Sequence, residues 1–415
     1  MDMVSVLTTT AAVIGLYMAW NIGANDVANA MGTSVGSGAL TLRRAIVVAA
    51  VFEFCGALLV GGSVTETISK GIVDASSLGG DNLSFALGMT CSLLAAAIWL
   101  NIATFLGWPV STTHSIVGAV IGFGIVAGGF SSVDWSKVSL IVASWIISPI
   151  CGGFVGYFFF IHIRKRILAE RNPLQAMQRY GPLMLFPIGT MLTLSLIYKG
   201  LKPLKLDLPL SSAGLISVGV GIALVLIATP ILRKVASESH GIRYSENLKR
   251  TERVFLYLQV ATASFVAFAH GSNDVANAVG PLAAVFGALQ NGFTEEVQVP
   301  MKVLLLGACG IVIGLATYGY KVIATVGEKI TELTPSRGFT AEFAAATTIL
   351  VCSKLGLPVS TTHTLIGSVI GVGFARSVGA INTQVLRGII ASWFITVPFT
   401  AILAAALFAL SSLLF

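Results

Sequence analysis

The chain has 415 residues, of which 55% are hydrophobic and 10% are charged, and its mean hydropathy is +0.88. Soluble domains carry roughly a quarter charged residues, so this composition excludes a soluble protein and predicts an all-α polytopic membrane protein. The net charge of +7 does not indicate nucleic-acid binding, because the lysines and arginines lie in short loops between apolar stretches, where they set membrane topology.

The first apolar stretch contains the sequence NIGANDVANAMG, which starts at residue 21. An ionised Asp26 within a membrane helix costs at least about 2.5 to 3.5 kcal/mol on insertion scales, so it needs a partner. Asn29 would share its helix face. Gly23 and the polar pair Asn25-Asp26 predict an interrupted helix, whose freed carbonyl, amide and carboxylate oxygens suit a hard cation. The alternative is that these side chains only join helices through hydrogen bonds.

The second apolar stretch, residues 45–64, contains Glu53 in the sequence VFEFCG. A lone acid within a span needs a partner or a path to water. Glu53 is therefore a candidate acid for coupling to a cation.

A helical hairpin follows, and its turn contains the sequence WPVSTTH. Gly107 is predicted to end one helix and Pro109 to occupy the first position of the next. The hydroxyls that would cap this helix belong to Ser111, Thr112 and Thr113. A helix N-terminus within the membrane, with hydroxyls beside it, is an anion site that needs no basic side chain. The alternative is a proline kink in which the hydroxyls bond to freed carbonyls.

A middle insert, residues 161–252, holds two more apolar stretches near 183–198 and 213–232. Basic, polar segments flank this pair on both sides. Two crossings place both flanks on one face of the membrane, which the positive-inside rule makes cytoplasmic. The insert shows no pattern typical of a binding site.

The rest of the chain repeats the first part, because NDVANA and PVSTTH both recur in the same order. This predicts two repeats, residues 1–160 and 253–415. An odd number of crossings between their starts predicts inverted topology, with broken helices and about 12 transmembrane or hairpin segments in all. The second copies supply Asn273, Asp274 and Asn277 for a cation, and Ser360, Thr361 and Thr362 for an anion.

Three further titratable residues lie near these motifs, and each has two candidate roles. Glu342, in RGFTAEF, lies near a predicted loop and is either a second coupling acid or a solvated acid. His114 and His363 follow the two hydroxyl triplets. Each could shuttle protons or orient its hairpin, and the structural role is favoured.

Inverted symmetry can bring both hairpin N-termini to one point near the membrane midplane. Two N-termini and six hydroxyls fit a small tetrahedral oxyanion, and cations at Asp26 and Asp274 would offset its charge. A rival reading is an intramembrane aspartyl hydrolase with these two residues as its dyad, which leaves the hydroxyls unused. A second rival is an ion channel. The sequence indicates no cofactor.

The segments GANDVANAMGTSVGSG and HGSNDVANAVGP and the paired PVSTTH motifs closely resemble the inorganic phosphate transporter (PiT) family, which carries phosphate with sodium or protons. The resemblance covers both repeats. It implies an inverted-repeat fold with both termini outside. It also implies that the two hydroxyl triplets line the phosphate site and that Asp26, Asn29, Asp274 and Asn277 belong to the cation sites.

The resemblance favours sodium as the coupling ion. Glu53 and Glu342 match acids of the sodium-coupled animal members, whereas proton-coupled bacterial members tend to have Asn in place of Glu53. One departure is Met89, where animal members have a glutamate, and this puts any transport step that relies on that acid in doubt. We expect a sodium-coupled phosphate importer in the cell membrane, embedded in lipid, with a homodimer as one option. Proton coupling and another tetrahedral oxyanion stay open.

Overall fold

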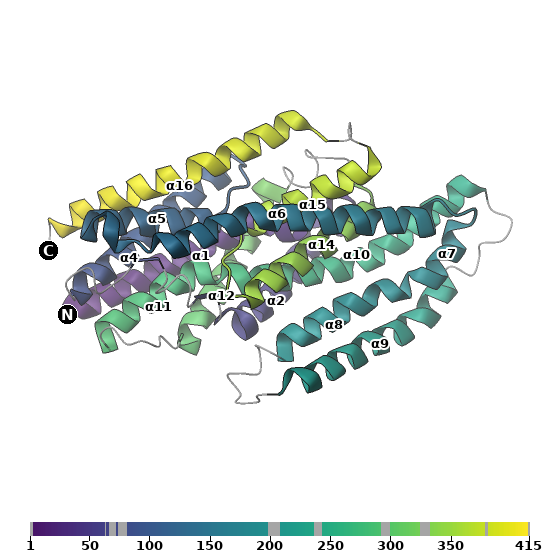
Figure 1. Cartoon of the computed structure of the whole chain (residues 1–415), viewed down its shortest axis with the longest axis horizontal. Helices are drawn as coiled ribbons and strands as arrows, with labels where there is room; N and C mark the ends of the chain where they lie inside the picture. Colours follow the sequence, from purple (N-terminus) through teal and green to yellow (C-terminus); the bar gives the residue numbers. More distant parts are fainter. Residues whose placement is uncertain are drawn as a thin grey trace.

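The computed structural model describes residues 3–62, 64–65, 72–73, 81–197, 208–235, 243–291, 299–323, 333–377 and 381–413. Within these ranges the chain is helical apart from short connections and one isolated bridge between Val73 and Val133. Six helices are long and apolar enough to cross a membrane. The all-α polytopic fold predicted from composition is confirmed (Figure 1).

The helices follow the order expected from the repeats. The first repeat contains α1 (Met3–Gly36), α2 (Leu42–Val60), α4 (Asn82–Phe105), α5 (Thr112–Gly128) and α6 (Trp135–Ile163). The insert contains the π-helical turn η3 (Arg164–Leu168), α7 (Pro173–Tyr180), η4 (Pro182–Met184), α8 (Leu185–Ser195) and α9 (Leu210–Val235). The second repeat contains α10 (Tyr244–Asp274), α11 (Ala276–Asn291), α12 (Met301–Thr317), α14 (Pro335–Lys354), α15 (Thr361–Arg376) and α16 (Thr383–Ser412).

The two repeats pack by exchanging partners. α1 packs along α12 and α10 packs along α2, while α15 lies against α6 and α5 lies against α16. In Figure 1, α1 runs away from the N-terminus, α10 runs in the opposite direction, and both termini lie at the same end of the molecule. This reciprocal packing is typical of inverted repeats and supports our proposed division into residues 1–160, 161–252 and 253–415.

Glycines allow the exchanged helices to approach closely. A Cβ atom on Gly23 would lie 1.9 Å from the carbonyl oxygen of Ile311, and one on Gly314 would lie 1.9 Å from that of Trp20. In the α2–α10 pair, Gly56 and Gly271 make the corresponding contacts. A side chain at any of these positions would force the helices apart. This small-residue packing, which is typical of membrane helices, fixes α1 and α10 against their partners.

The predicted interruption near Asn25 and Asp26 is wrong for the first repeat. α1 is one helix of 34 residues, about 51 Å long, because Gly23 serves helix packing and no proline lies within it. It therefore crosses the membrane once. The second repeat is only distorted at this point: Val275 separates α10 from α11 but has helical dihedral angles, and its N–H still donates to the carbonyl oxygen of Gly271 at 3.4 Å. Pro281, in α11, has no N–H to donate within the helix.

Candidate functional site

Both hairpins turn at a left-handed glycine. α4 ends before Gly107, whose φ is +70°, and the N–H of Trp108 donates to the carbonyl oxygen of Ala103 at 2.8 Å. In the second hairpin Gly356 has φ +71°, and the N–H of Leu357 makes the matching bond to the carbonyl oxygen of Cys352 at 3.1 Å. In each hairpin this hydrogen bond satisfies a carbonyl group at the end of the helix, which lipid could not do. The position of the glycine therefore determines where the helix ends.

The next helices begin three residues later than predicted. α5 starts at Thr112, and the hydroxyl of Ser111 caps it by accepting the N–H of His114 at 3.2 Å. Ser360 caps α15 in the same way at 3.2 Å. The prediction that Pro109 is the first helical residue is wrong, because the helix begins after the serine that can act as its cap. The break at membrane depth is nonetheless present in both repeats.

The two hydroxyl motifs interlock. The hydroxyl of Thr113 donates to the carbonyl oxygen of Val359 at 3.1 Å, and that of Thr362 donates to the carbonyl oxygen of Val110 at 3.2 Å. Each threonine thus reaches the backbone of the opposite repeat. The structure therefore brings the N-termini of α5 and α15 together from opposite directions, as the inverted repeats led us to expect.

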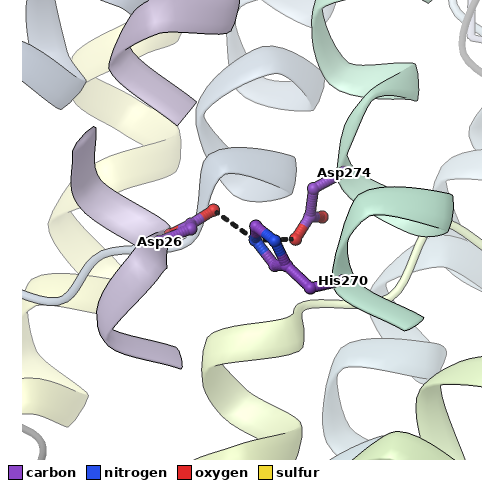
Figure 2. A group of neighbouring side chains, drawn as sticks. All are labelled: Asp26, His270 and Asp274. Carbon is purple, nitrogen blue, oxygen red and sulfur yellow. Dashed lines mark ion pairs between the residues drawn. The ribbon is translucent and has the colours of Figure 1, made fainter. Parts of the chain in front are cut away.

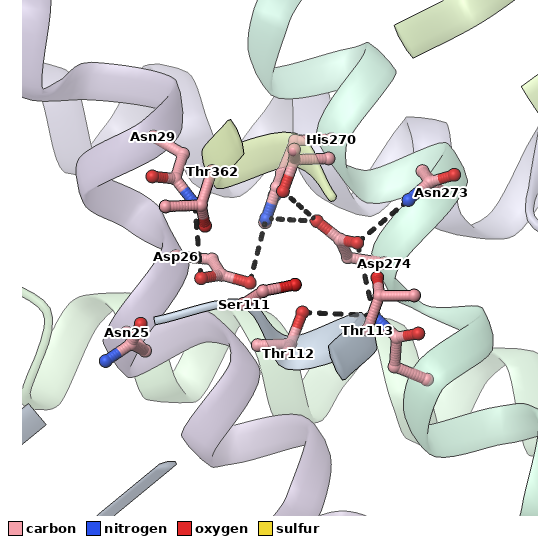
Figure 3. A network of polar contacts seen from close by, with 12 residues as sticks. Asn25, Asp26, Asn29, Ser111, Thr112, Thr113, His270, Asn273, Asp274 and Thr362 are labelled. Atoms are coloured by element: carbon pink, nitrogen blue, oxygen red, sulfur yellow. Dashed lines mark hydrogen bonds and ion pairs between the residues drawn. The ribbon is translucent and has the colours of Figure 1, made fainter. Parts of the chain in front are cut away.

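The NDVANA motifs also cross over between the repeats (Figure 3). The amide of Asn29 donates to the hydroxyl of Thr362 at 2.7 Å. The amide of Asn277 donates to the hydroxyl of Thr112 at 3.0 Å. The same amides bond to Asp26 at 3.2 Å and Asp274 at 3.1 Å, so the expected shared helix faces are present. All twelve predicted binding residues are buried; they are Asn25, Asp26, Asn29, Ser111, Thr112, Thr113, Asn273, Asp274, Asn277, Ser360, Thr361 and Thr362.

Asn25 and Asn273 hold the hairpin turns in place. Asn25 donates to the carbonyl oxygen of Trp108 at 3.1 Å and accepts the N–H of Val110 at 3.3 Å. Asn273 donates to the carbonyl oxygen of Val359 at 3.0 Å and accepts the hydroxyl of Ser353 at 3.2 Å. Because both ends of each amide are engaged, this geometry favours a positioning role for the pair.

His270 lies at the centre of the site, between Asp26 and Asp274 (Figure 2). Its Nε2 is 2.9 Å from Oδ2 of Asp274 and 3.7 Å from Oδ2 of Asp26, and its Nδ1 is 3.3 Å from Oε1 of Glu53. The sequence analysis missed this residue. Its position four residues before Asp274, on the same face of an apolar helix, could have revealed it.

Buried acids outnumber buried bases at this centre. Three carboxylates surround one imidazole, which can carry one positive charge at most. Within the described residues, several buried acceptors receive no hydrogen bond; they are Oδ2 of Asp26, Oδ1 of Asn29, both carboxylate oxygens of Glu53 and Oδ1 of Asn277. Uncompensated buried charge is strongly unfavourable, and oxygen-rich sets suit hard cations. The arrangement can therefore accept cations together with an anion.

Glu342 is fully buried, so the solvated alternative is wrong. Its carboxylate accepts hydroxyls from Thr33, Ser34 and Thr262 at 2.6 Å each, and the amide of Gln259 at 3.0 Å. These donors lie on α1 and α10, which enclose this part of α14. Glu342 is thus held in an oxygen-lined site between three helices.

His114 and His363 pack behind the hydroxyl motifs. Their ring centroids are 4.3 Å apart, and each packs against a tryptophan: His114 is tilted against Trp145 at 3.7 Å and His363 stacks on Trp393 at 3.5 Å. This packing favours the structural role. Met89 is buried in α4, so the acid that animal family members carry there is replaced by an apolar core residue.

Comparisons with known proteins agree over nearly the whole chain. A family model described as the phosphate transporter family matches residues 22–404. The chloroplastic inorganic phosphate transporter 2-1 of Arabidopsis thaliana is 46% identical, over 96% of this chain and 71% of that protein. A putative phosphate permease of Haemophilus influenzae is 45% identical, over 97% of this chain and 96% of that protein. A solved structure, described as the sodium-dependent phosphate transporter, matches with a TM-score of 0.92 and 40% identity, over 99% of this chain and 100% of that chain.

Proposed function

Because the chain belongs to the phosphate transporter family, we propose that it imports inorganic phosphate by symport with sodium ions. The protein is a multi-pass membrane transporter and not an enzyme. The identity of the coupling ion, the binding residues and the direction of transport belong to the proposal. The neighbour described as sodium-dependent supports the choice of sodium.

The proposed phosphate site lies between the N-termini of α5 and α15. The serine caps occupy the third amide of each helix, and the first two amides point out of the helix ends. These amides offer donors from both sides of a tetrahedral anion. The triplet hydroxyls would add to them, and those of Thr113, Thr361 and Thr362, which donate to protein oxygens in this structure, would have to turn toward the anion. No basic side chain is needed, because two helix N-termini supply partial positive charge.

The observation that carries sodium coupling is the excess of buried carboxylates over the single imidazole of His270, together with buried oxygens that accept no hydrogen bond in the described structure. Adding phosphate to three carboxylates and one imidazole would raise the negative charge further. Cations at Asp26 with Asn29, and at Asp274 with Asn277, would offset that charge. Sodium and phosphate should therefore tighten each other's binding by the same factor. Glu53 and Glu342 are proposed as additional coupling acids.

Carboxylates beside the anion also favour phosphate over sulfate. Thr361 donates to Oδ2 of Asp274 at 2.6 Å, which places this acid next to the proposed anion site. Dibasic phosphate has an O–H group that a carboxylate can accept, whereas sulfate has none and would be repelled. Arsenate should therefore compete with phosphate for uptake, and sulfate should not.

The test is phosphate uptake into vesicles that contain the purified protein. An inward sodium gradient at equal pH should drive accumulation, and a gradient of potassium should not. Uptake that ignores sodium and follows an inward proton gradient would overturn the choice of ion. Each gradient is measured in the presence and absence of the other, so that the two ions are separated.

Proton coupling is the second candidate because His270 contacts three carboxylates. Such a cluster can bind and release a proton at the centre of the protein. The vesicle experiment separates this candidate from sodium coupling. The aspartyl hydrolase alternative has no geometric support, since the imidazole lies between Asp26 and Asp274 and keeps them from sharing a proton.

We further propose that the protein resides in the cell membrane and assembles as a homodimer. Cell fractionation would test the first point, and it is informative because one relative is chloroplastic. Light scattering of the purified protein, corrected for bound detergent, would test the second. A monomer mass would contradict the dimer without affecting the transport proposal.

A further inference from the structure

The insert contains a pocket far from the central site. α7, η4 and the last turns of α9 enclose a cavity of about 640 Å³. These elements lie at the end of the molecule opposite the two chain termini (Figure 1). The pocket shares no residue with the site between α5 and α15, so ligand binding in the pocket does not depend on the proposed transport function.

Three arginines line this cavity: Arg171, Arg179 and Arg233. Glu170 also lines it, but within the described residues no carboxylate forms an ion pair with any of the three. All three side chains are exposed. Arg179 lies over the ring of Tyr180, 5.6 Å from its centroid, which leaves its charge uncompensated by any anion. Guanidinium groups that share one cavity without a carboxylate partner repel each other and attract an anion. Their planar N–H donors match the oxygens of a phosphate group especially well.

The remaining wall has a polar part, with Asn172, Gln175, Gln178 and Thr229, and an apolar part that adjoins the exposed side of α9. Ala176, Pro182, Leu183 and Val225 form the apolar wall. Beyond it, Leu226, Ile227 and Ile231 are 67%, 61% and 57% exposed. Exposed apolar side chains on a membrane helix contact hydrocarbon. Because the helix then ends with Arg233 and Lys234, the pocket lies where hydrocarbon gives way to a basic membrane surface.

We propose that this pocket binds the headgroup of an anionic phospholipid. The phosphate would contact the arginines, and the adjoining part of the acyl chains would cover the apolar wall. Basic pockets between membrane helices on this face of a bilayer commonly bind such headgroups. Inorganic phosphate shares the anionic chemistry but would leave the apolar wall uncovered. The bound lipid would also brace the insert, because Gln178 already links α7 to the carbonyl oxygen of Arg233 at 3.4 Å.

The test measures thermal unfolding of the purified full chain in neutral detergent. Dioctanoyl phosphatidylglycerol should raise the Tm saturably, and dioctanoyl phosphatidylcholine should not. Combining Arg171→Gln, Arg179→Gln and Arg233→Gln should weaken the apparent lipid affinity about 100-fold. This corresponds to about fivefold per arginine, or about 1 kcal/mol for each basic residue at a membrane surface.

A matched control removes three basic charges outside the pocket. Lys165→Gln, Arg166→Gln and Arg253→Gln should leave the lipid affinity unchanged, since these exposed residues do not line the cavity. Thr229→Trp, which fills the cavity without changing its charge, provides a second variant if the triple arginine variant does not fold. An equal response to phosphatidylcholine, or equal losses in both charge variants, would overturn the proposal. Displacement of the lipid by millimolar inorganic phosphate would assign the pocket to a free anion instead.

Discussion

The two repeats share their binding motifs but differ in their charged residues. Four residues before the shared aspartate, the second repeat has His270 and the first has Ile22. Glu53 in α2 corresponds to Ile311 in α12, because the carbonyl oxygen of each lies against the equivalent glycine of the other repeat, Gly271 and Gly23 respectively. The duplicated residues thus form a nearly symmetric set of polar side chains around the proposed anion site. The residues present once set the charge balance around it.

The hairpins differ in the same way. Glu342 in α14 has an apolar counterpart, Leu93, at the same distance before the PVSTTH motif of the first repeat. One donor to Glu342 is Thr33, on the unbroken α1, whereas the equivalent position of the second repeat is Pro281, which has neither a hydroxyl nor an N–H. The proposed phosphate site and the two proposed cation sites at the aspartates are thus symmetric, whereas the additional acids Glu53 and Glu342 and the imidazole of His270 occur in one copy each.

The largest effect should come from the shared aspartates. Asp26→Asn and Asp274→Asn should each lower the initial rate of sodium-driven phosphate uptake at least ~100-fold, because each removes a charge that a cation must meet. Vesicle uptake measures this rate. Asp134→Asn is the control, since Asp134 caps α6 at the surface and Asn also caps helices. A severe loss in only one of the two aspartate variants would show that the repeats do not share cation binding.

Replacing His270 by isoleucine, the residue at the equivalent position of the first repeat, should have the next largest effect, a loss of stability. His270→Ile leaves three buried carboxylates without their imidazole, and breaking a buried charge pair costs about 3–5 kcal/mol of unfolding free energy. Sodium should restore part of this stability, because bound cations can replace the lost partner. Thermal unfolding with and without sodium measures both changes. His162→Gln, at an exposed position on α6, should change neither the stability nor its dependence on sodium.

Removing the carboxylate of Glu342, which has no acidic counterpart in the first hairpin, should lower the affinity for sodium more than that for phosphate. Glu342→Gln should raise the sodium concentration for half-maximal uptake about tenfold, equivalent to ~1.4 kcal/mol, while phosphate affinity at saturating sodium changes little. The reason is that Glu342 contacts neither PVSTTH motif in the described structure. Glu246→Gln, at a half-exposed acid on α10, is the control. An equal loss of phosphate affinity would place Glu342 in the anion site.

The crossing hydroxyls test the symmetric part of the site. Thr113→Val and Thr362→Val keep the side-chain shape and remove the hydroxyl's bond to the backbone of the opposite repeat, which is worth about 0.5–1.5 kcal/mol. They also remove the bond that each hydroxyl accepts from the opposite repeat, from Asn277 and Asn29 respectively. Each should weaken phosphate binding by a similar factor, roughly two- to tenfold, in a calorimetric titration with sodium present. Clearly unequal losses would show that the anion lies closer to one helix than to the other.

The sequence was informative where the chain repeats itself. Two copies of PVSTTH identified the hairpin breaks, and two copies of NDVANA identified the residues that surround the centre. It failed where one copy differs. His270 was missed because its place one turn before Asp274 reveals only one of its three acidic partners, and Asp26 and Glu53 reach it from other helices. The break predicted in α1 was wrong because Gly23 serves close packing against α12, which only the fold reveals.

The smallest effect is expected at the start of the hairpins, where the repeats differ in their caps. Asp81 caps α4 by accepting the N–H groups of Leu83 at 3.0 Å and Ser84 at 3.2 Å, and the Ser84 hydroxyl at 2.5 Å. In the second repeat Thr334 makes no side-chain cap, and Glu252 from α10 accepts the N–H of Ser336 instead. Asp81→Ala should therefore cost about 1 kcal/mol at pH 7, whereas Asp81→Asn should cost little.

The hydrogen bonds from Ser84 lower the pKa of Asp81 below its ordinary value. A lowered pKa in the folded state means that the carboxylate's contribution is complete above the unfolded pKa, about 3.9, and is lost as the pH falls through the folded value. The stability difference between wild type and Asp81→Ala should thus be constant from pH 7 to about pH 5 and shrink below pH 4. Thermal unfolding across this range measures it. A difference that already shrinks between pH 7 and pH 5 would mean that another titrating group, and not the local cap, governs the start of the first hairpin.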